Sequence, residues 1–156
     1  MPATAGPQPG QADLAAWPGI DCVGRRLTLA ARLARQVFDR RLAAAGSTFA
    51  SYVTLGMLSE HGPVIQRRLA ATLGVEAATL TRQLERLERD GLVAREPAAG
   101  DHRAMLVRLT DQGRSLLRRL DGVMAAADAE LCEPLTAEQA GQLSGLLDQL
   151  TASSRG

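Results

Sequence analysis

The sequence predicts a mainly α-helical protein that carries one small β-hairpin between its helices. Apolar residues recur at steps of three and four along most of the chain beyond residue 20, which is the periodicity of amphipathic helices. Two short stretches, 92–96 and 104–109, instead have the composition of strands and flank a loop that contains Gly100. Aromatic residues make up only 3% of the 156 residues, against 46% hydrophobic residues, so we expect a core of Leu, Val and Ala.

The order of the predicted elements begins with four helices. Residues 1–19 are rich in Pro, Gly and Ala and are expected to form a disordered tail. A long amphipathic helix is predicted from Asp21 to Ala45, and Thr48 is placed to cap a second helix that ends near His61. A short third helix, about 64–73, ends at Gly74. A fourth covers about 76–90, and Gly91 follows it as a left-handed C-terminal residue.

Two further helices follow the predicted hairpin. Thr110 begins a long fifth helix, and Thr136 with Gln139 resembles a capping box that opens the last one. Central helices followed by a two-stranded hairpin predict a winged helix-turn-helix lobe over residues 48–110. The apolar stripes of the outer helices are too wide for so small a core. We therefore expect residues 20–47 and 111–152 to form a helical dimerisation region.

The segment 69–92, LAATLGVEAATLTRQLERLERDGL, carries the main functional signal. Leucines occupy one face of its second helix, and the opposite face is polar. Arg can bridge guanine, Gln can bridge adenine, and a Thr methyl can meet the thymine methyl in the major groove. By itself such a stripe is more often a solvated helix face, but the helix-turn-helix spacing and the following hairpin favour DNA binding. The predicted contacts are Ala77, Ala78, Thr79, Thr81, Arg82, Gln83 and Arg86.

The hairpin loop adds a second candidate contact. A wing beside a recognition helix can reach the neighbouring minor groove, where a narrow groove attracts Arg. Asp101 stands two residues before Arg103 and could pair with its guanidinium and hold it extended. The alternative is a surface ion pair worth at most about 1 kcal/mol. Asp101, His102 and Arg103 are therefore predicted as wing contacts.

The chain resembles the MarR family of bacterial transcription regulators, and in particular its SlyA-like branch, over about residues 25–150. The resemblance is carried by LAATLGVEAATLTRQLERLERDGLVARE and GDHRAMLVRLTDQGRSLL. The family pattern of Asp-x-Arg followed by Leu-Thr-x-x-Gly is met here by Asp101, Arg103, Leu109, Thr110 and Gly113. The resemblance implies a homodimer that binds a pseudo-palindromic operator in double-stranded DNA. It also implies a minor-groove role for Arg103 and, most often in this family, repression relieved by a small molecule such as a phenol.

The chain departs from the family pattern at one position of the wing. At the wing, His102 occupies a position that is often a second Arg in the family, which removes a fixed charge.

Family ligand pockets are lined from the first two helices, where this chain has aromatic and sulfur-containing side chains. An ordinary core role is the alternative for these residues. The candidate pocket residues are Phe38, Phe49, Tyr52 and Met57.

The two cysteines, Cys22 and Cys132, lack metal-ligand spacing, so neither a metal nor a cofactor is predicted. One branch of the family senses peroxides through a cysteine near its first helix, and Arg25 and Arg26 would favour a thiolate at Cys22. That branch pairs its cysteine with tyrosines, whereas this chain has a single Tyr. Redox sensing through Cys22 is therefore the weaker alternative to an inert thiol.

Other classes of function are less well supported. The two histidines form no catalytic set with Ser, Cys or Asp, and no Gly-rich phosphate loop is present, so an enzyme is not expected. A non-catalytic winged-helix module that binds only protein is a second alternative, against which Arg82 and Arg103 argue. The net charge of +1 and the lack of a long apolar run predict a cytoplasmic protein that does not bind membranes.

Overall fold

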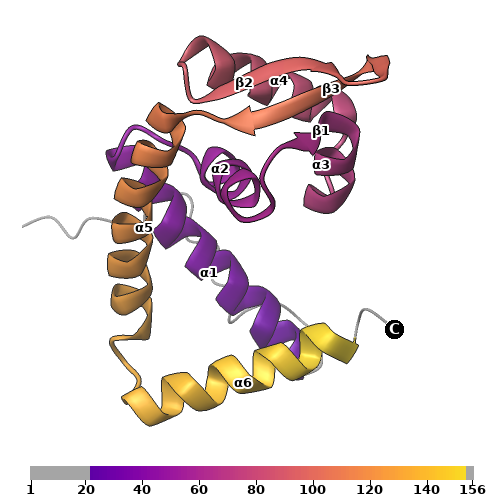
Figure 1. Cartoon of the computed structure of the whole chain (residues 1–156). Coiled ribbons are helices and arrows are strands. Elements are labelled where there is room, and N and C mark those ends of the chain that lie inside the picture. The colour runs from indigo at the N-terminus through magenta and orange to yellow at the C-terminus, as the bar shows by residue number, and fades with distance from the viewer. Residues whose placement is uncertain (1–21, 154–156) are drawn as a thin grey trace, which may run out of the picture. The chain divides into compact units, whose positions relative to one another are not determined.

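The computed structural model describes residues 22–153, so the expected tail, with Trp17, lies outside the described residues. The predicted mainly helical fold with a small sheet is confirmed (Figure 1). Contacts divide the chain within its first helix into a unit up to residue 36 and a unit from residue 37 onward. The elements are α1 (Val23–Ala44), α2 (Phe49–His61), β1 (Val64–Ile65), α3 (Gln66–Leu73), α4 (Ala77–Arg89), β2 (Val93–Ala98), β3 (Asp101–Leu109), α5 (Asp111–Cys132) and α6 (Ala137–Ser153).

Side-chain caps set the starts of α2 and α6 where the sequence predicted them. The Oγ1 atom of Thr48 accepts a hydrogen bond from the backbone N–H of Ser51 at 3.1 Å. Before α6, the backbone N–H of Gln139 donates to Thr136 Oγ1 at 3.2 Å, and the N–H of Thr136 donates to Gln139 Oε1 at 2.9 Å. This reciprocal pair is the predicted capping box. Each cap satisfies N–H groups that have no partner within the helix.

The sheet has three strands in the order β1-β3-β2, whereas the sequence predicted only a hairpin. The sequence predicts a helix start at Val64 and Ile65, but these residues form β1 and pair antiparallel with Val107 and Leu106 of β3. Both residues are β-branched, which suits them to a strand that pairs with a distant part of the chain. The helix therefore begins at Gln66.

The hairpin strands are also longer than predicted. β2 continues to Ala98 and β3 begins at Asp101, so that only Ala99 and Gly100 form the turn. Gly100 has a φ of +84°, a conformation that side chains disfavour. The hairpin extends from its junction with α5 to this turn as a two-stranded arm (Figure 1).

The core of the second unit is built from aliphatic side chains, as the composition predicted. It joins α2, α3, α4, the sheet and the start of α5 around fully buried leucines such as Leu55, Leu80 and Leu84, each 0% exposed. Burying a leucine contributes roughly 1.5–3 kcal/mol, so this cluster supplies most of the stability of the lobe. Its buried members are Leu55, Leu58, Leu69, Ala70, Leu80, Leu84, Leu87, Leu92, Val93, Val107, Leu109 and Leu117.

The sheet and α5 pack closely at Gly113, where there is no room for a side chain. The Oγ1 atom of Thr110 accepts the backbone N–H of Gly113 at 3.0 Å and lies 2.7 Å from the carbonyl oxygen of Gly91. A Cβ atom at Gly113 would stand 2.1 Å from the carbonyl oxygen of Leu92, so no side chain fits there. This contact gives a physical reason for the Leu-Thr-x-x-Gly pattern at the start of α5.

The last helix has a different character, because none of its described residues is buried. Three of its leucines are strongly exposed: Leu143 at 46%, Leu146 at 58% and Leu150 at 45%. Within residues 22–153 no single helix has the length and apolar composition of a membrane span, although α1 and α2, taken as one bent pair, meet those two criteria.

Replacement of Gly113 by Ala tests the packing of the sheet against α5. We expect Gly113→Ala to lower the free energy of unfolding by roughly 3 kcal/mol, because the new methyl group overlaps the Leu92 carbonyl. Gly122→Ala on the same helix meets nothing within 4 Å. This control should be neutral or stabilising by about 0.5–1 kcal/mol. Urea denaturation of both variants measures the difference, and equal stability of the two would contradict the assigned contact.

Candidate nucleic-acid interface

The helices α3 and α4 are joined by a tight turn of three residues, Gly74, Val75 and Glu76. Gly74 is left-handed (φ 64°, ψ 30°), and its N–H donates to the carbonyl oxygens of Ala70 and Ala71. The backbone of Glu76 is extended, and its side chain does not cap α4. This left-handed stop followed by a new helix gives α3 and α4 the arrangement of a helix-turn-helix.

The helix α4 has one buried face and one exposed face. Leu80, Leu84 and Leu87 are at most 2% exposed and belong to the core. Thr79 and Arg82 project from the other side and are exposed. Within residues 22–153 neither side chain makes a hydrogen bond or an ion pair, so both are free to meet another molecule. Ala77 and Ala78 in the first turn are exposed as well.

Two other residues of the predicted polar stripe are bound to α2. The Nε2 atom of Gln83 donates to Thr54 Oγ1 at 2.8 Å, and Thr54 is only 1% exposed. The Nη2 atom of Arg86 donates to Ser51 Oγ at 2.9 Å, and Ser51 is 4% exposed. These bonds satisfy polar groups that would be costly to bury unpaired, and they fix α4 along α2.

Thr81 binds α3, on the side of α4 opposite to α2. Its Oγ1 atom accepts a hydrogen bond from Gln66 Nε2 of α3 at 2.8 Å and donates to the carbonyl oxygen of Ala77 at 2.8 Å. The helix α4 is therefore held by polar contacts from α2 on one side and from α3 on the other. Ser51, Thr54 and Gln66 were not among the residues predicted from the sequence. The only available signal was that two small polar residues share the α2 face that carries Leu55 and Leu58.

The hairpin is attached to the last turn of α4 through an ion pair. Glu88 accepts hydrogen bonds from Arg95 of β2, at 2.9 Å from Nε, 2.6 Å from Nη2 and 3.2 Å from the backbone N–H. The Arg95 side chain is only 17% exposed. These hydrogen bonds lower the pKa of Glu88 below its ordinary value, and they outweigh the opposing effect of burial. The pair positions the wing relative to α4.

At the wing tip only the backbone is described. Asp101, His102 and Arg103 begin β3, where the pairing of Ala98 with Asp101 follows a register irregularity. The side chains of these three residues lie outside the described part of the structure, so the expected pairing of Asp101 with Arg103 stays a prediction. Nearer the base of the hairpin, Arg108 Nε lies 4.0 Å from Glu96 Oε1 in an exposed pair.

The four candidate pocket residues are divided among different contacts. Phe38 and Phe49 stack with ring centroids 6.2 Å apart. The Tyr52 hydroxyl donates to Asp121 Oδ1 of α5 at 3.0 Å, and burial together with this bond raises the pKa of Tyr52. Met57 lines a pocket of about 440 Å³ formed by the C-terminal end of α2, β1, α3 and β3, whereas the other three residues do not. We call this cavity the α2–α3 pocket.

The two cysteines were the other candidate groups in the sequence. Cys22 is exposed and Cys132 is partly buried, and both are free thiols. In the part of the chain that the structure describes, no three His, Cys, Asp or Glu side chains come together in a way that could hold a metal ion.

Known proteins match both the sequence and the fold of this chain. The model of the MarR family matches residues 45–104, which run from before α2 into β3. The apo form of wild-type MarR from E. coli is 26% identical with a TM-score of 0.79, and the match covers 85% of this chain and 98% of that one. A MarR family protein from Mycobacterium tuberculosis, solved in complex with DNA, is 29% identical with a TM-score of 0.75 and coverages of 84% and 98%.

A third similar structure is a cysteine-to-serine mutant of E. coli MarR complexed with operator DNA. It is 26% identical with a TM-score of 0.72, and the match covers 82% of this chain and 92% of that one. Residues 45–104 thus match the MarR family, and the chain has the winged-helix fold of the MarR transcription regulators to which it is similar. Its place in the SlyA-like branch stays a prediction.

The ion pair between α4 and the wing makes a prediction about pH. Because the folded-state pKa of Glu88 is lowered, its stabilising contribution is present above the unfolded pKa of about 4.3 and is lost as the pH falls through the lowered value. We expect Glu88→Gln to have a lower Tm than the parent at pH 6, and this difference to shrink towards pH 3. Thermal unfolding across this range measures it. A Tm difference that stays constant with pH would show that the carboxylate charge is not responsible.

Proposed function

We propose that this protein is a sequence-specific, double-stranded-DNA-binding transcriptional regulator that acts as a homodimeric repressor and is relieved by a small molecule. One observation carries the proposal. The face of α4 that presents Thr79 and Arg82 is exposed and unpaired among the described residues, while the rest of the helix is rigidly held. Two similar proteins with this fold have been solved in complex with DNA, which supports the same role here.

In this proposal α4 enters the major groove. Arg82 is suited to the O6 and N7 atoms of a guanine, and the methyl group of Thr79 to a thymine methyl. Ala77 and Ala78 are small and exposed, so the N-terminal end of α4 can approach the DNA backbone closely. A tightly held helix loses little entropy when it binds, which favours a defined register on the bases.

The other predicted contacts on α4 take a supporting role. Thr81, Gln83 and Arg86 each bind a neighbouring helix through one group. Arg86 uses Nη2 for Ser51, and its remaining N–H groups can still reach a phosphate, because the side chain is exposed overall. Gln83 has one amide N–H and its carbonyl oxygen left for a base edge. We assign base reading chiefly to Arg82 and positioning chiefly to Gln83.

The wing is proposed to contact the adjacent minor groove. The arm formed by β2 and β3 ends in a two-residue turn, and Asp101, His102 and Arg103 follow that turn directly. Arg103 is the proposed minor-groove probe, Asp101 the residue that orients it, and His102 a neighbour of the DNA backbone. The pair of Glu88 and Arg95 sets the distance between this arm and α4.

A homodimer is proposed from the outer helices. Val23 in α1 is 70% exposed and Leu146 in α6 is 58% exposed, and large exposed apolar side chains of this kind favour burial against a second copy. Two-fold symmetry then predicts a pseudo-palindromic operator whose half-sites lie about 10 bp apart. Cysteine-based sensing and a purely protein-binding role gain no support from the contacts described above.

Base reading by Arg82 is testable on DNA from immediately upstream of the coding region. Arg82→Ala should weaken specific binding by about 1–3 kcal/mol and relax the preference at one base pair of each half-site. The control Arg119→Ala removes the same charge from an exposed site on α5. Fluorescence anisotropy against single-base operator variants provides the measurement. If Arg82→Ala weakened binding equally for all sequences, its role would be confined to the phosphates; absence of any DNA binding by the parent would refute the proposed function.

The homodimer is tested on α6. Leu146→Glu places a charge on the most exposed of the three leucines and should raise the dimer dissociation constant at least about tenfold, as the loss of a buried anchor does. Ser144→Glu introduces the same charge at another exposed position of α6 and should have little effect. Sedimentation equilibrium measures both constants. A monomeric parent, or an equal effect of the two variants, would contradict the proposed interface.

A further inference from the structure

Gln66, the first residue of α3, has a side-chain amide of which only one end is bonded. Its Nε2 atom donates a hydrogen bond to Thr81 Oγ1 of α4 at 2.8 Å. Its carbonyl oxygen, Oε1, is buried and accepts no hydrogen bond from any residue that the structure describes. A buried carbonyl oxygen without a partner destabilises a fold, and few such groups occur in native proteins. Stability alone therefore does not explain why a glutamine occupies this position.

The Thr81 hydroxyl fixes the orientation of this amide. A hydroxyl group has a single proton to donate, and Thr81 donates it to the carbonyl oxygen of Ala77 at 2.8 Å. Thr81 can then only accept a hydrogen bond from Gln66, so the amide NH2 group faces Thr81 and the carbonyl oxygen points away from it. The unpaired oxygen is thus a direct consequence of the bond that joins α3 to α4.

This bond lies in the half of α4 that carries the proposed base contacts. The side-chain bonds that join α4 to α2 and to the wing come from Gln83 and from residues after it. Within residues 77–82, the contact with Gln66 is the one side-chain hydrogen bond to another element of the described structure. Leu80 packs into the core beside it, but apolar packing is non-directional and constrains the rotation of a helix less than a hydrogen bond does.

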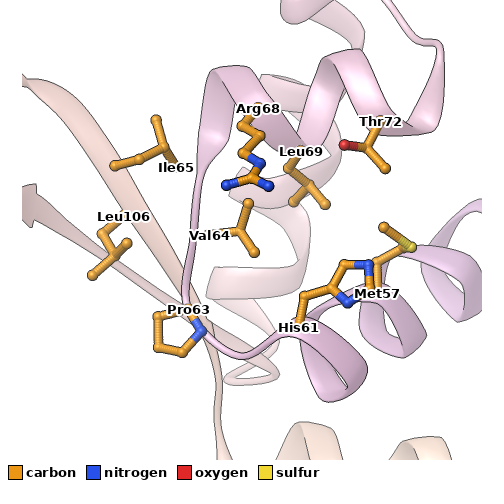
Figure 2. A pocket seen from close by; sticks show the side chains of 9 residues that line it. All are labelled: Met57, His61, Pro63, Val64, Ile65, Arg68, Leu69, Thr72 and Leu106. Atoms are coloured by element: carbon orange, nitrogen blue, oxygen red, sulfur yellow. The ribbon is translucent and has the colours of Figure 1, made fainter.

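Gln66 also connects α4 to the strand that carries the tip of the wing. It directly follows β1, in which Ile65 pairs antiparallel with Leu106 of β3. Figure 2 shows Ile65 beside Leu106, and Leu69 farther along α3. The strand β3 is also the one that carries Arg103. A single side chain therefore joins the helix proposed for the major groove to the strand proposed for the minor groove.

We propose that Gln66 is a positioning residue for sequence recognition: its bond to Thr81 fixes the N-terminal half of α4 relative to the wing. Arg82 then meets its base in a defined register. Gln66 itself does not touch DNA, because the free end of its amide is buried. A displaced arginine can still bind a phosphate but loses the paired hydrogen bonds to a base edge. The inference rests on the proposed DNA-binding function and adds a residue that determines its specificity.

Gln66→Met tests the proposal, because methionine has a similar length and lacks both polar groups of the amide. Loss of the bond is offset by loss of the unpaired oxygen, so the midpoint of urea denaturation should not fall. The preference for upstream DNA over a scrambled fragment of the same composition should fall at least about fivefold, as for a misplaced base contact. The affinity for the scrambled fragment should change less than about twofold, since it depends on phosphate contacts.

Fluorescence anisotropy measures both affinities, and Gln142→Met is the matched control. Gln142 lies exposed on α6, so the same chemical change there should alter neither the urea midpoint nor the preference between the two fragments.

Thr81 supplies a second, independent measurement. Thr81→Val removes the hydroxyl group and should lower the preference for upstream DNA, whereas Thr81→Ser keeps the hydroxyl and should retain it. In the Thr81→Val background, Gln66→Met should cause no further loss of preference, because Gln66 acts through the bond that is already absent.

Several outcomes would overturn the positioning role of Gln66. An unchanged preference in Gln66→Met would show that the bond does not affect recognition. A lower urea midpoint with an equal loss of affinity for both fragments would reduce Gln66 to a stabilising residue, and additive losses in the double variant would show that it does not act through Thr81. A parent without any preference for upstream DNA would instead refute the proposed function itself, so the two failures are distinguishable.

Discussion

The burial of the leucine face of α4 is the interaction on which the rest of the structure depends. Leu80, Leu84 and Leu87 are almost completely removed from solvent in the core. At roughly 1.5–3 kcal/mol for each side chain, they outweigh the polar bonds of the same helix, which contribute about 1 kcal/mol each. The leucines therefore supply the stability of α4. The hydrogen bonds of Thr81 and Gln83 constrain its orientation, because they tie α4 to α3 on one side and to α2 on the other.

In the wing and at α5, too, apolar contacts supply stability and a few specific contacts set the geometry. The arm of β2 and β3 is anchored in the core by Val93, Val107 and Leu109, while Glu88 and Arg95 set its position along α4. At its base, the absence of a side chain at Gly113 lets α5 pack directly on the Leu92 carbonyl. Apolar contacts thus join the elements, and a few specific contacts define their geometry.

Much of the fold could be predicted because local chemistry determines it. Thr48, Thr110 and the Thr136–Gln139 pair mark helix starts by their own hydrogen bonds. Gly74 ends its helix where expected, and Gly91 has the positive φ expected of it. The resemblance to the MarR family could also be seen in the sequence, because it is carried by short continuous motifs in the α4 and wing segments. The strand β1 was missed, because Val64 and Ile65 pair with residues more than 40 positions away and nothing local distinguishes them from the start of a helix.

The candidate site depends on contacts between segments that are distant in the sequence, which local patterns do not determine. From the sequence alone, the spacing of Thr79, Arg82, Gln83 and Arg86 determined that they share the polar side of one helix, because helical geometry depends only on sequence separation. Only the tertiary structure decided that Gln83 and Arg86 bind α2 whereas Arg82 binds no described residue. The partners Thr54 and Ser51 are distant in the sequence, and only the packing of α2 beside α4 brings them within hydrogen-bond distance. The α2–α3 pocket was likewise invisible in the sequence, since its walls come from α2, β1, α3 and β3. A hydrogen bond or a cavity between distant segments depends on how their surfaces pack, and that packing is a property of the whole fold.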